Sequence, residues 1–396
     1  MKLIPFYFPQ FYRTPENDAW WGEGFTDWDL VKSARPHFVG QRLPRQPLDG
    51  YYCQSEPEVL RRQVALAKRH GISAFNFYHY WFDGVACLDA PVQNFLRDPA
   101  IQGFEFCLTW ANESWTRQWR GRPNDYLIRQ RHNPSPKLWG RHFDYLRPLF
   151  EDARYLKVDG RPVFIVYRAE LIRRLPAFLA FMRAQAEQAG FPGLYLIAGR
   201  AYPMLNAKRL YAGFDAVMDF EPRFSINSHL RRLPEWRMQV ESLLRHLPEW
   251  TQRRLQQLSG PRGGGRFNYE DYLRTLEQRA PVLDGKPAFP TVFPDWDNGA
   301  RYAERATFFA GAAPQQFARA LALAASSLRA LSRADRGAPE FLFINAWNEW
   351  SEAAYLEPDT EFGYAFLETV RDFLSQPARP GEAGDPVELR AALRRA

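Results

Sequence analysis

The stretch Pro57–Tyr78, PEVLRRQVALAKRHGISAFNFY, contains the unit that decides the fold of this 396-residue chain. Pro57–His70 spaces its apolar residues as an amphipathic helix does, and Gly71 follows at a position typical of a helix end. Ile72–Tyr78 is a continuous apolar and aromatic run, which is typical of a buried strand. A helix that leads directly into a buried strand predicts a parallel α/β fold.

Similar strand-like runs recur along the chain, and amphipathic stretches such as Leu175–Gln188 and Pro314–Ser332 separate most of them. The eight predicted strands are Lys2–Tyr7, Ile72–Tyr78, Phe104–Trp110, Pro162–Tyr167, Leu194–Ala198, Phe214–Phe220, Ala288–Phe293 and Phe341–Asn345. Eight strands that alternate with helices favour a (β/α)8 TIM barrel of the α/β class. A doubly wound sheet is the alternative, but no G-x-G-x-x-G follows any of the strands.

Two regions are longer than a minimal barrel requires. Phe8–Tyr52 is a long aromatic and polar loop after the first strand, and Pro222–Pro287 is an arginine-rich insertion after the sixth. We expect residues 1–376 to form a single catalytic domain that carries this insertion at about 222–287. Residues 377–396 form a charged C-terminal tail that we expect to pack loosely.

The arginine-rich insertion predicts helical patches near Glu235–Leu258 and Glu270–Arg279, with a flexible connection over Ser259–Arg266. Its arginines alternate with leucine and tryptophan, a pattern that favours a lid over the cleft and peripheral contact with an anionic membrane. A solvated helical decoration is the alternative interpretation. The N-terminal run is short and is broken by Pro5 and Pro9, so it predicts no signal peptide, and we expect a cytoplasmic protein.

The composition narrows the classes of protein. Hydrophobic residues are 46% and charged residues 24%, an ordinary globular balance, and no run approaches the ~18 apolar residues of a membrane-spanning helix. The net charge of +7 would suit nucleic acid, yet no helix-turn-helix, zinc-finger or RNP motif is present, so we expect no nucleic-acid partner. Cys53, Cys87 and Cys107 predict neither a disulfide framework nor a thiolate zinc site.

Aromatic and polar residues gather after the predicted strands, at the end where (β/α)8 enzymes place their active sites. This mixture suits sugars, because aromatic rings cover C–H faces while carboxylates and amides bond the hydroxyl groups. Candidate stacking residues are Trp20, Trp21, Trp81, Trp110 and Trp347. Further candidate substrate-binding residues are Gln10, Asp27, His79, Tyr80, Asn112, Glu113, Trp296, Asp297, Asn345 and Asn348. Some of these tryptophans also suit the layer between strands and loops, and His79 equally suits the core.

The segment Glu349-Trp350-Ser351-Glu352, after the eighth strand, holds the sharpest chemical signal. Two carboxylates three residues apart face one cleft where the segment turns helically. Glycoside cleavage needs such a pair, with one carboxyl held protonated and the other charged. The same spacing is common on solvated helices, but the position inside an aromatic segment favours a catalytic pair.

Several motifs, in their order along the chain, resemble the WbsX-type proteins, which are glycoside hydrolase family 99-like proteins encoded with bacterial O-antigen and capsule genes. The longest motif runs from Phe343 to Glu352, FINAWNEWSE, and continues with YLEPD at Tyr355–Asp359. The other motifs are Phe8–Phe11 (FPQF), Asn17-Asp18, Trp20–Trp28 (WWGEGFTDW), Phe77–Gly84 (FYHYWFDG), Trp110–Thr116 (WANESWT), Pro162–Ile165 (PVFI) and Phe293–Asn298 (FPDWDN). The resemblance covers about residues 1–375 and implies a (β/α)8 barrel.

The resemblance also implies a mechanism. Family 99 endo-α-mannosidases carry a similar Trp-Asn-Glu-Trp-x-Glu-Gly segment, whose first Glu deprotonates the sugar's 2-OH so that this oxygen attacks C1. Carried over by motif, Glu349 is that base and Glu352 is the general acid/base of a retaining enzyme with an α-mannoside-type substrate. The chain departs from the family 99 pattern at Ala353, usually Gly there, and at Ser351, often His. Asp27 stands where WbsX-type relatives usually have Glu, and these departures bear on the choice of substrate.

Two other functions compete with this interpretation. A sugar-nucleotide-dependent glycosyltransferase of lipopolysaccharide biosynthesis would use a D-x-D pair, and Asp27-Trp28-Asp29 and Asp295-Trp296-Asp297 both fit the pattern. A catalytically silent glycan-binding barrel is disfavoured because both glutamates are present. For the glycosidase-like enzyme we expect an oligosaccharide or glycolipid substrate, no cofactor and no metal. The sequence gives no indication of the oligomeric state.

Overall fold

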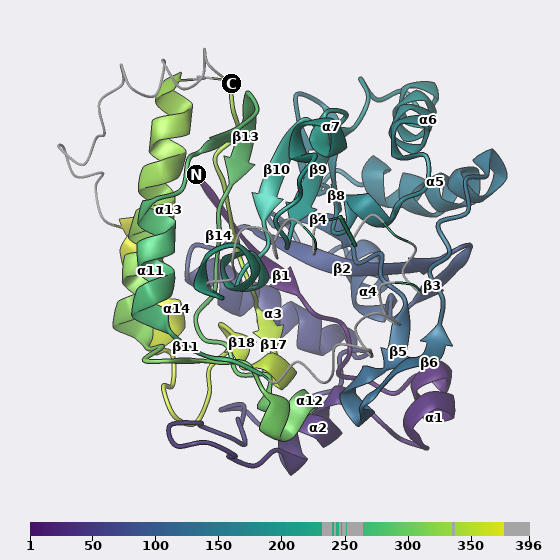
Figure 1. Ribbon diagram of the computed structural model, residues 1–396. Helices are drawn as coiled ribbons and strands as arrows, with labels where there is room; N and C mark the ends of the chain where they lie inside the picture. Colours follow the sequence, from purple (N-terminus) through teal and green to yellow (C-terminus); the bar gives the residue numbers. More distant parts are fainter. Residues whose placement is uncertain are drawn as a thin grey trace.

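The computed structural model describes residues 1–231, 264–334 and 337–375, with positions 240, 243–244, 247 and 251. These residues form a mixed α/β fold built on a sheet of parallel strands (Figure 1). The predicted tail 377–396 and most of the predicted helical patch Glu235–Leu258 lie outside the described residues. So does most of the predicted connection Ser259–Arg266, of which Gly264 onward is described.

The central strands follow the predicted ones closely. They are β1 (Lys2–Tyr7), β2 (Ala74–Phe82), β4 (Glu105–Trp110), β8 (Arg161–Val166), β9 (Tyr195–Arg200), β10 (Ala216–Asp219) and β16 (Phe341–Ile344). From β1 to β10 each strand pairs in parallel with the next one in this order, and β16 pairs in parallel with the other edge of β1. Continuous apolar runs therefore predicted the strands of this sheet correctly.

The seventh predicted strand, Ala288–Phe293, is divided at Pro290, which has no N–H to donate to a strand ladder. Its first part, β13 (Lys286–Phe289), pairs in parallel with β10, and its second part, β14 (Thr291–Val292), pairs in parallel with β16. The Pro290 carbonyl accepts a hydrogen bond from the Phe343 N–H at 3.0 Å. Strands β13 and β14 are thus consecutive in the chain but pair with strands near opposite ends of the sheet. This connection brings the two ends of the sheet together, which makes the arrangement TIM-barrel-like.

Helices lie around the strands in Figure 1, and their apolar side chains complete the core. They are α3 (Pro57–Arg69), α4 (Ala90–Arg97), α5 (Pro136–Glu151), α6 (Leu175–Gln188), α7 (Ala207–Tyr211), α13 (Pro314–Ala334) and α14 (Ala365–Ser375). Because the strands are covered on both faces, every residue from Leu3 to Tyr7 is buried rather than every second one. The prediction of a helix over Pro57–His70 is confirmed by α3.

The long loop predicted over Phe8–Tyr52 contains two short helices, α1 (Pro15–Trp21) and α2 (Asp27–Ser33). The Thr14 side chain accepts the Asn17 N–H in the first turn of α1, and Thr26 forms a reciprocal capping box with Asp29 at the start of α2. These caps fix where α2 begins, and the first residue of that helix is Asp27. The aromatic loop is therefore an ordered support for a carboxylate.

The described part of the predicted insertion Pro222–Pro287 is mainly helical. Its elements are α8 (Arg223–Ser225), η3 (Ile226–Leu230), β11 (Arg266–Asn268), α11 (Tyr269–Glu277) and β12 (Val282–Leu283). Helix α11 confirms the helical patch predicted near Glu270–Arg279. Strand β11 pairs in parallel with β15 (Phe308–Ala310), which ties the end of the insertion to the segment that follows β14.

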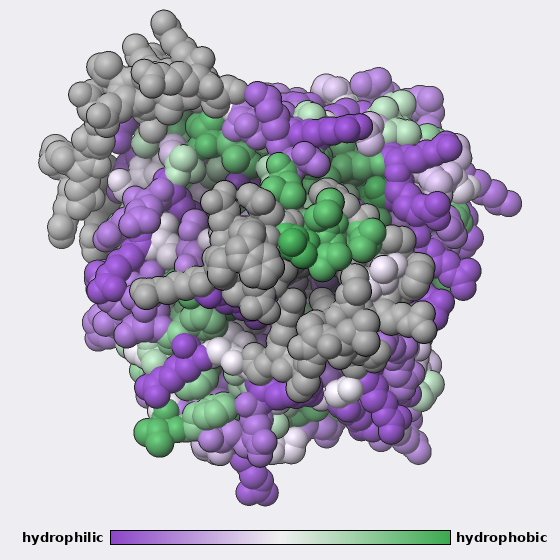
Figure 2. Space-filling view, viewed as in Figure 1, coloured by the Kyte–Doolittle hydropathy of each residue, from purple (hydrophilic) through white to green (hydrophobic). Residues whose placement is uncertain are grey.

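The face of the molecule shown in Figure 2 is hydrophilic over most of its rim and carries apolar residues nearer its centre. Exposed large hydrophobic residues include Leu205, Val240, Leu243 and Leu247, and the last three belong to the arginine-rich insertion. Within the described ranges, no helix combines the length and the apolar character that crossing a bilayer requires.

Candidate active site

Arg301 joins three carboxylates near the C-terminal ends of the strands. Its Nη1 donates to Glu352 Oε1 at 2.9 Å, while its Nη2 donates to Asp27 Oδ2 at 2.7 Å and to Glu349 Oε1 at 3.2 Å. The exposed fraction is 0% for Asp27, 4% for Glu349, 7% for Glu352 and 9% for Arg301. One guanidinium thus faces three buried carboxylates, and the cluster has an excess of negative charge when all three are ionised.

Separate parts of the chain supply this cluster. Asp27 begins α2, and Arg301 lies on the short helix α12 (Gly299–Tyr302) that follows β14. The two glutamates come from the segment after β16: Glu349 ends β17 (Asn348–Glu349) and Glu352 ends the turn η5 (Trp350–Glu352). The turn predicted between the two glutamates is therefore present, and it brings both onto one guanidinium.

Ala353 follows Glu352 with a φ of 52°, in the left-handed region. Glycine adopts this conformation with little strain, whereas in alanine it costs about 1 kcal/mol or more of conformational free energy. Ala353 thus keeps the backbone shape for which glycine is better suited. The Ala353 N–H also closes the turn by donating to the Trp350 carbonyl at 3.2 Å.

Asp27 is the most buried carboxylate of the cluster. Its Oδ2 accepts hydrogen bonds from Arg301 and from the Ser351 hydroxyl, the latter at 3.0 Å. Its Oδ1 has no partner among the described residues. A fully buried carboxylate oxygen is rarely left unpaired, so this atom is a natural acceptor for a ligand hydroxyl.

The pKa of Glu349 is raised well above that of an ordinary glutamate. Burial is the largest cause, and the negative charges of Glu352 and Asp27 add to it, while Arg301 opposes the shift. Burial likewise raises the pKa of Tyr80, whose hydroxyl lies close enough to Glu349 to feel its charge. Glu349 is therefore a stronger base, once ionised, than a solvated carboxylate.

A second layer of hydrogen bonds holds the segment that carries the glutamates. Asn348 accepts the Phe8 N–H at 2.7 Å and donates to the Phe8 carbonyl at 3.0 Å, which fastens the segment to the end of β1. Glu357 accepts from Tyr52, Gln63 and Trp350 at 2.6, 2.6 and 2.7 Å. Asn348, predicted to bind substrate, thus has both side-chain polar atoms engaged with the backbone.

Several predicted site residues do gather at the cluster. The Gln10 carbonyl accepts the Asp27 N–H at 3.3 Å, and the Gln10 side chain bonds Tyr80. The Asp297 N–H donates to the Glu352 carbonyl at 2.8 Å, and the Asp297 carboxylate accepts from Gln41. Burial raises the pKa of Asp297 to about 6. Asp297 therefore anchors the loop beside Glu352.

Other predicted residues have structural partners instead. The Asn112 side chain bonds both the N–H and the carbonyl of Arg168, each at 2.8 Å, and Glu113 forms an ion pair with the same arginine. The Asn345 side chain donates to the Glu221 carbonyl at 2.8 Å. Trp296 is buried as well, at 3% exposure. These residues shape the strand ends around the cluster.

Three predicted residues lie on the opposite side of β2 and β4. His79 and Trp81 both contact His142 of helix α5, and Trp110 contacts the same ring. Side chains alternate along a strand, so Tyr78 and Tyr80 of β2 face the carboxylates while His79 and Trp81 face away. The sequence analysis placed His79, Tyr80, Trp81 and Trp110 at one site because the sequence identifies the strand end but not the face.

The predicted stacking residues are divided between the core and a partly exposed position beside the cluster. Trp347 is fully buried and packs against Phe75, with 5.1 Å between ring centroids, so it lies in the core. Trp20 and Trp21 are partly exposed. Trp21 stacks on Trp119 with 5.5 Å between centroids and 16° between planes, and the Arg301 guanidinium lies 4.7 Å from the Trp119 ring centroid. Trp21 and Trp119 thus form an aromatic surface beside the cluster.

Sequence reasoning missed Arg301, Trp119 and Arg223. Arg301 is one of many arginines and lies 48 residues before Glu349 in the chain, so no local pattern marks it. Trp119 follows the recognised motif around Asn112 but lies in a separate turn, η1 (Gln118–Arg120). Arg223, at the start of α8, has its pKa raised by the nearby Tyr167 above all, and the charge of Glu352 contributes.

The two D-x-D pairs are each split between separate partners. Asp27 belongs to the Arg301 cluster, whereas Asp29 caps α2 through the Thr26 N–H. Asp295 accepts from Arg42 and Arg45 at 2.6 and 2.5 Å, and Asp297 accepts from the Gly299 N–H. Within residues 1–231, 264–334 and 337–375, no group of three or more His, Cys, Asp or Glu is arranged to hold a metal ion.

The carboxylate cluster at the strand ends of a TIM-barrel-like fold is the kind of site found in glycan-active enzymes. Residues 3–370 match the family described as glycosyltransferase WbsX, and the chain belongs to that family. Two proteins named WxcX, from two strains of Xanthomonas campestris pv. campestris, are each 35% identical to it over 379 residues. The match covers 94% of this chain but only 50% of either relative, so the chain spans about half their length.

Solved structures share the fold at low sequence identity. A glycoside hydrolase-like protein matches with a TM-score of 0.55 at 14% identity, covering 95% of this chain and 94% of that one. The family 99 endo-α-mannosidase from Bacteroides thetaiotaomicron matches with a TM-score of 0.53 at 15% identity, covering 100% and 98%. The family resemblance inferred from the motifs is thereby confirmed.

Replacing Arg301 with leucine should destabilise the fold by about 3–5 kcal/mol at neutral pH, because it leaves buried carboxylates without a cation. The folded-state pKa of Glu349, already raised, then lies further above its unfolded value. The loss of stability in R301L is therefore largest above that pKa. It shrinks as the pH falls through that pKa, since protonation of Glu349 removes its uncompensated charge. Urea unfolding of R301L and of the unmodified protein between pH 5 and pH 8 measures how this loss of stability changes with pH.

The matched control for this experiment is Arg319→Leu. Arg319 pairs with Glu270 on the surface, where their side chains are 50% and 38% exposed, and such pairs contribute about 1 kcal/mol or less. A loss in R301L that is as small as in R319L, or that does not change with pH, would show that Arg301 does not hold the carboxylates together.

Proposed function

We propose that this protein is a retaining glycan-active enzyme, glycosidase- or transglycosylase-like, that acts on α-mannoside-type substrates in bacterial surface polysaccharide metabolism. The observation that carries the proposal is the single guanidinium shared by Glu349 and Glu352 at the strand ends. Two carboxyl groups with different surroundings at one buried site are what glycoside cleavage requires. In this proposal the fold is a complete (β/α)8 barrel, with β13 and β14 acting as one strand that closes the ring.

In the first step, Glu349 takes the proton of the substrate's 2-OH, and the 2-oxygen attacks C1. The bond from C1 to the leaving oxygen breaks, and that oxygen takes a proton from Glu352. In the second step, water or a sugar hydroxyl attacks C1 and gives its proton to Glu352. The bond between C1 and the 2-oxygen breaks, and the 2-oxygen recovers its proton from Glu349. The attack is intramolecular, which raises the effective concentration of the nucleophile.

The charge of the site supports this route. The transition state carries positive charge on the sugar ring, and buried carboxylates stabilise such charge more strongly than solvated ones. Glu349 must be ionised to act as the base, and its pKa is raised by burial. Activity should therefore fall as the pH drops through a value above that of an ordinary glutamate.

A sugar-nucleotide-dependent glycosyltransferase of lipopolysaccharide biosynthesis is the second candidate, and the description of the matching family favours it. The splitting of both D-x-D pairs between separate partners counts against metal-held phosphates at those positions. A cytoplasmic location, where activated sugars are made, is compatible with both candidates. Contact with an anionic membrane, and thus a glycolipid substrate, is proposed from the arginine-rich insertion.

Replacing Glu349 or Glu352 with glutamine should lower kcat/KM by about 10²–10⁴-fold, because each substitution removes a proton-transfer partner. The measurement is hydrolysis or transfer from aryl α-mannosides. Glu368→Gln, on an exposed position of α14, is the matched control and should keep full activity. Equal activity in E349Q and in the control would remove Glu349 from the mechanism.

A 2-deoxy aryl glycoside separates the proposed route from an ordinary carboxylate nucleophile. It has no 2-OH to attack C1, so it should not be turned over, and mass spectrometry should find no adduct on Glu349. A glycosyl-enzyme adduct at Glu349 would assign that residue as the nucleophile instead.

Activity should also be unchanged by EDTA, because in the proposed route the two glutamates perform the proton transfers. The assay runs the same substrates with the chelator, then with added Mn²⁺, and tests sugar nucleotides in parallel. Loss of activity in EDTA that Mn²⁺ restores, with a sugar nucleotide consumed, would replace the proposal with the glycosyltransferase.

A further inference from the structure

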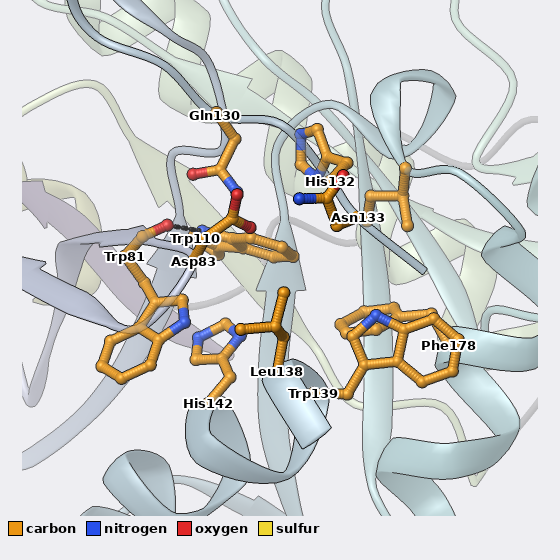
Figure 3. Close-up of a pocket in the computed structure, with 11 residues that line it drawn as sticks. Trp81, Asp83, Trp110, Gln130, His132, Asn133, Leu138, Trp139, His142 and Phe178 are labelled. Atoms are coloured by element: carbon orange, nitrogen blue, oxygen red, sulfur yellow. Dashed lines mark hydrogen bonds between the residues drawn. The ribbon is translucent and has the colours of Figure 1, made fainter. Parts of the chain in front are cut away.

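A small pocket lies on the outer side of β2 and β4, against helices α5 and α6 (Figure 3). Aromatic rings form much of its wall: Trp81 and Trp110 come from the strands, and Trp139 and Phe178 come from the helices. In Figure 3 the polar groups Gln130, His132 and Asn133 lie along one side, and Trp139 and Phe178 lie lower in the view. The pocket thus combines apolar walls with a polar edge.

This pocket is distinct from the carboxylate cluster. Trp81 lines the pocket. Tyr80, the preceding residue, lies near the carboxylate cluster, since the charges of Glu349, Arg301 and Asp27 affect the pKa of its hydroxyl. Adjacent residues of a strand point to opposite faces, so β2 lies between the two sites.

Two buried acceptors in the pocket wall have no partner among the described residues: Gln130 Oε1 and His132 Nδ1. Gln130 is 7% exposed and His132 is 8% exposed. His132 Nε2 lies 3.0 Å from the Asn112 carbonyl, so Nε2 carries the ring hydrogen and Nδ1 is left as an acceptor. Burial lowers the pKa of His132 to about 4, which keeps the ring neutral near pH 7. Unpaired buried acceptors are unfavourable, so these two atoms call for a ligand that donates hydrogen bonds.

The charges around the pocket favour a neutral donor over a cation. Arg131 is close enough to act on the Asp83 carboxylate at the pocket edge, and Arg168 is close enough to act on His132. These cations repel an ammonium group, while the two free acceptors repel an anion. A hydroxyl group on an apolar carbon donates its single hydrogen to one acceptor, which we assign as Gln130 Oε1, and its carbon packs against the aromatic walls.

The size of the pocket limits what can enter. Its interior holds about 20 Å³, which is close to the space that one water molecule occupies. A whole sugar ring is too large, but the hydroxymethyl arm of a hexopyranose projects from the ring. Its hydroxyl can enter while its carbon and the ring stay at the mouth. We propose that this pocket is a second carbohydrate-binding site, which takes the hydroxymethyl group of a hexopyranose between Trp81, Trp110 and the acceptors of Gln130 and His132.

A second contact of this kind would keep a glycan chain on the protein while another part of the chain occupies the catalytic cluster. Such a contact is weak alone, with a Kd of about 1–10 mM, but it raises the local concentration of the chain. The site takes the substrate class of the proposed function, yet its geometry is independent of the catalytic assignment.

The test compares methyl α-D-glucopyranoside with methyl α-D-xylopyranoside, which lacks only the hydroxymethyl group. Saturation-transfer NMR titrations on the full chain should show binding of the glucoside and at least about fivefold weaker binding of the xyloside. Gln130→Leu should weaken glucoside binding to a similar extent, whereas Gln188→Leu on the exposed side of α6 should not. The inactive variant E349Q should bind the glucoside as the unmodified protein does.

The outcomes separate this site from the catalytic one. Q130L removes an unpaired acceptor, so its stability should be unchanged or higher, and lost binding cannot be attributed to unfolding. Loss of glucoside binding in E349Q but not in Q130L would place the sugar at the carboxylates and overturn the proposal. Equal binding of both glycosides, or binding of neither, would overturn it too and leave the pocket a site for ordered water. A failed catalytic assay leaves this binding test unaffected.

Discussion

The contact of the Arg301 guanidinium with Asp27, Glu349 and Glu352 is the interaction on which the site depends. Buried carboxylates repel one another in a low dielectric, and none of them is exposed enough for water to screen that repulsion. Arg301 offsets part of the repulsion and at the same time fixes the positions of three segments that are far apart in sequence. The loop after β1, the segment after β14 and the segment after β16 are thereby held in one arrangement.

The same constraint explains the surrounding hydrogen bonds. A charged cluster without a rigid frame would relax toward water, so the glutamate segment is fastened by Asn348 to the end of β1 and by Glu357 to Tyr52, Gln63 and Trp350. The Asn348 and Glu357 side chains are buried, and both form their hydrogen bonds with the surrounding protein rather than with a ligand. Trp119 and Trp21 lie beside the frame and remain partly exposed, which leaves them as the aromatic surface of the site.

The sequence predicted the strands well, because runs such as Phe341–Ile344 are apolar and are buried on both faces. It also predicted that Glu349 and Glu352 lie together, because their spacing and their place after the last strand are local features. It could not predict Arg301, whose role depends on contacts between segments distant in the chain. Nor could it assign faces: in a strand covered on both sides, hydrophobicity no longer distinguishes inward from outward positions. For that reason Trp81 and Trp110, expected beside the carboxylates, lie at a second pocket.

The positions at which the motifs predict departures from the family 99 and WbsX-type patterns lie at one corner of the site. Ser351 stands at a position where the family 99 pattern predicts histidine, and Asp27 at one where the WbsX-type pattern predicts glutamate. The Ser351 hydroxyl donates to Asp27 Oδ2. A shorter carboxylate leaves space, and the hydroxyl of Ser351 binds an oxygen that would otherwise be less well satisfied. Ala353 keeps the left-handed turn and thus the position of Glu352. These positions therefore belong to the Asp27 side of the cluster, and the two glutamates stay in place. In the proposed route, a change of substrate would act through the group that meets the unpaired Oδ1 of Asp27 and would leave the proposed proton transfers unchanged.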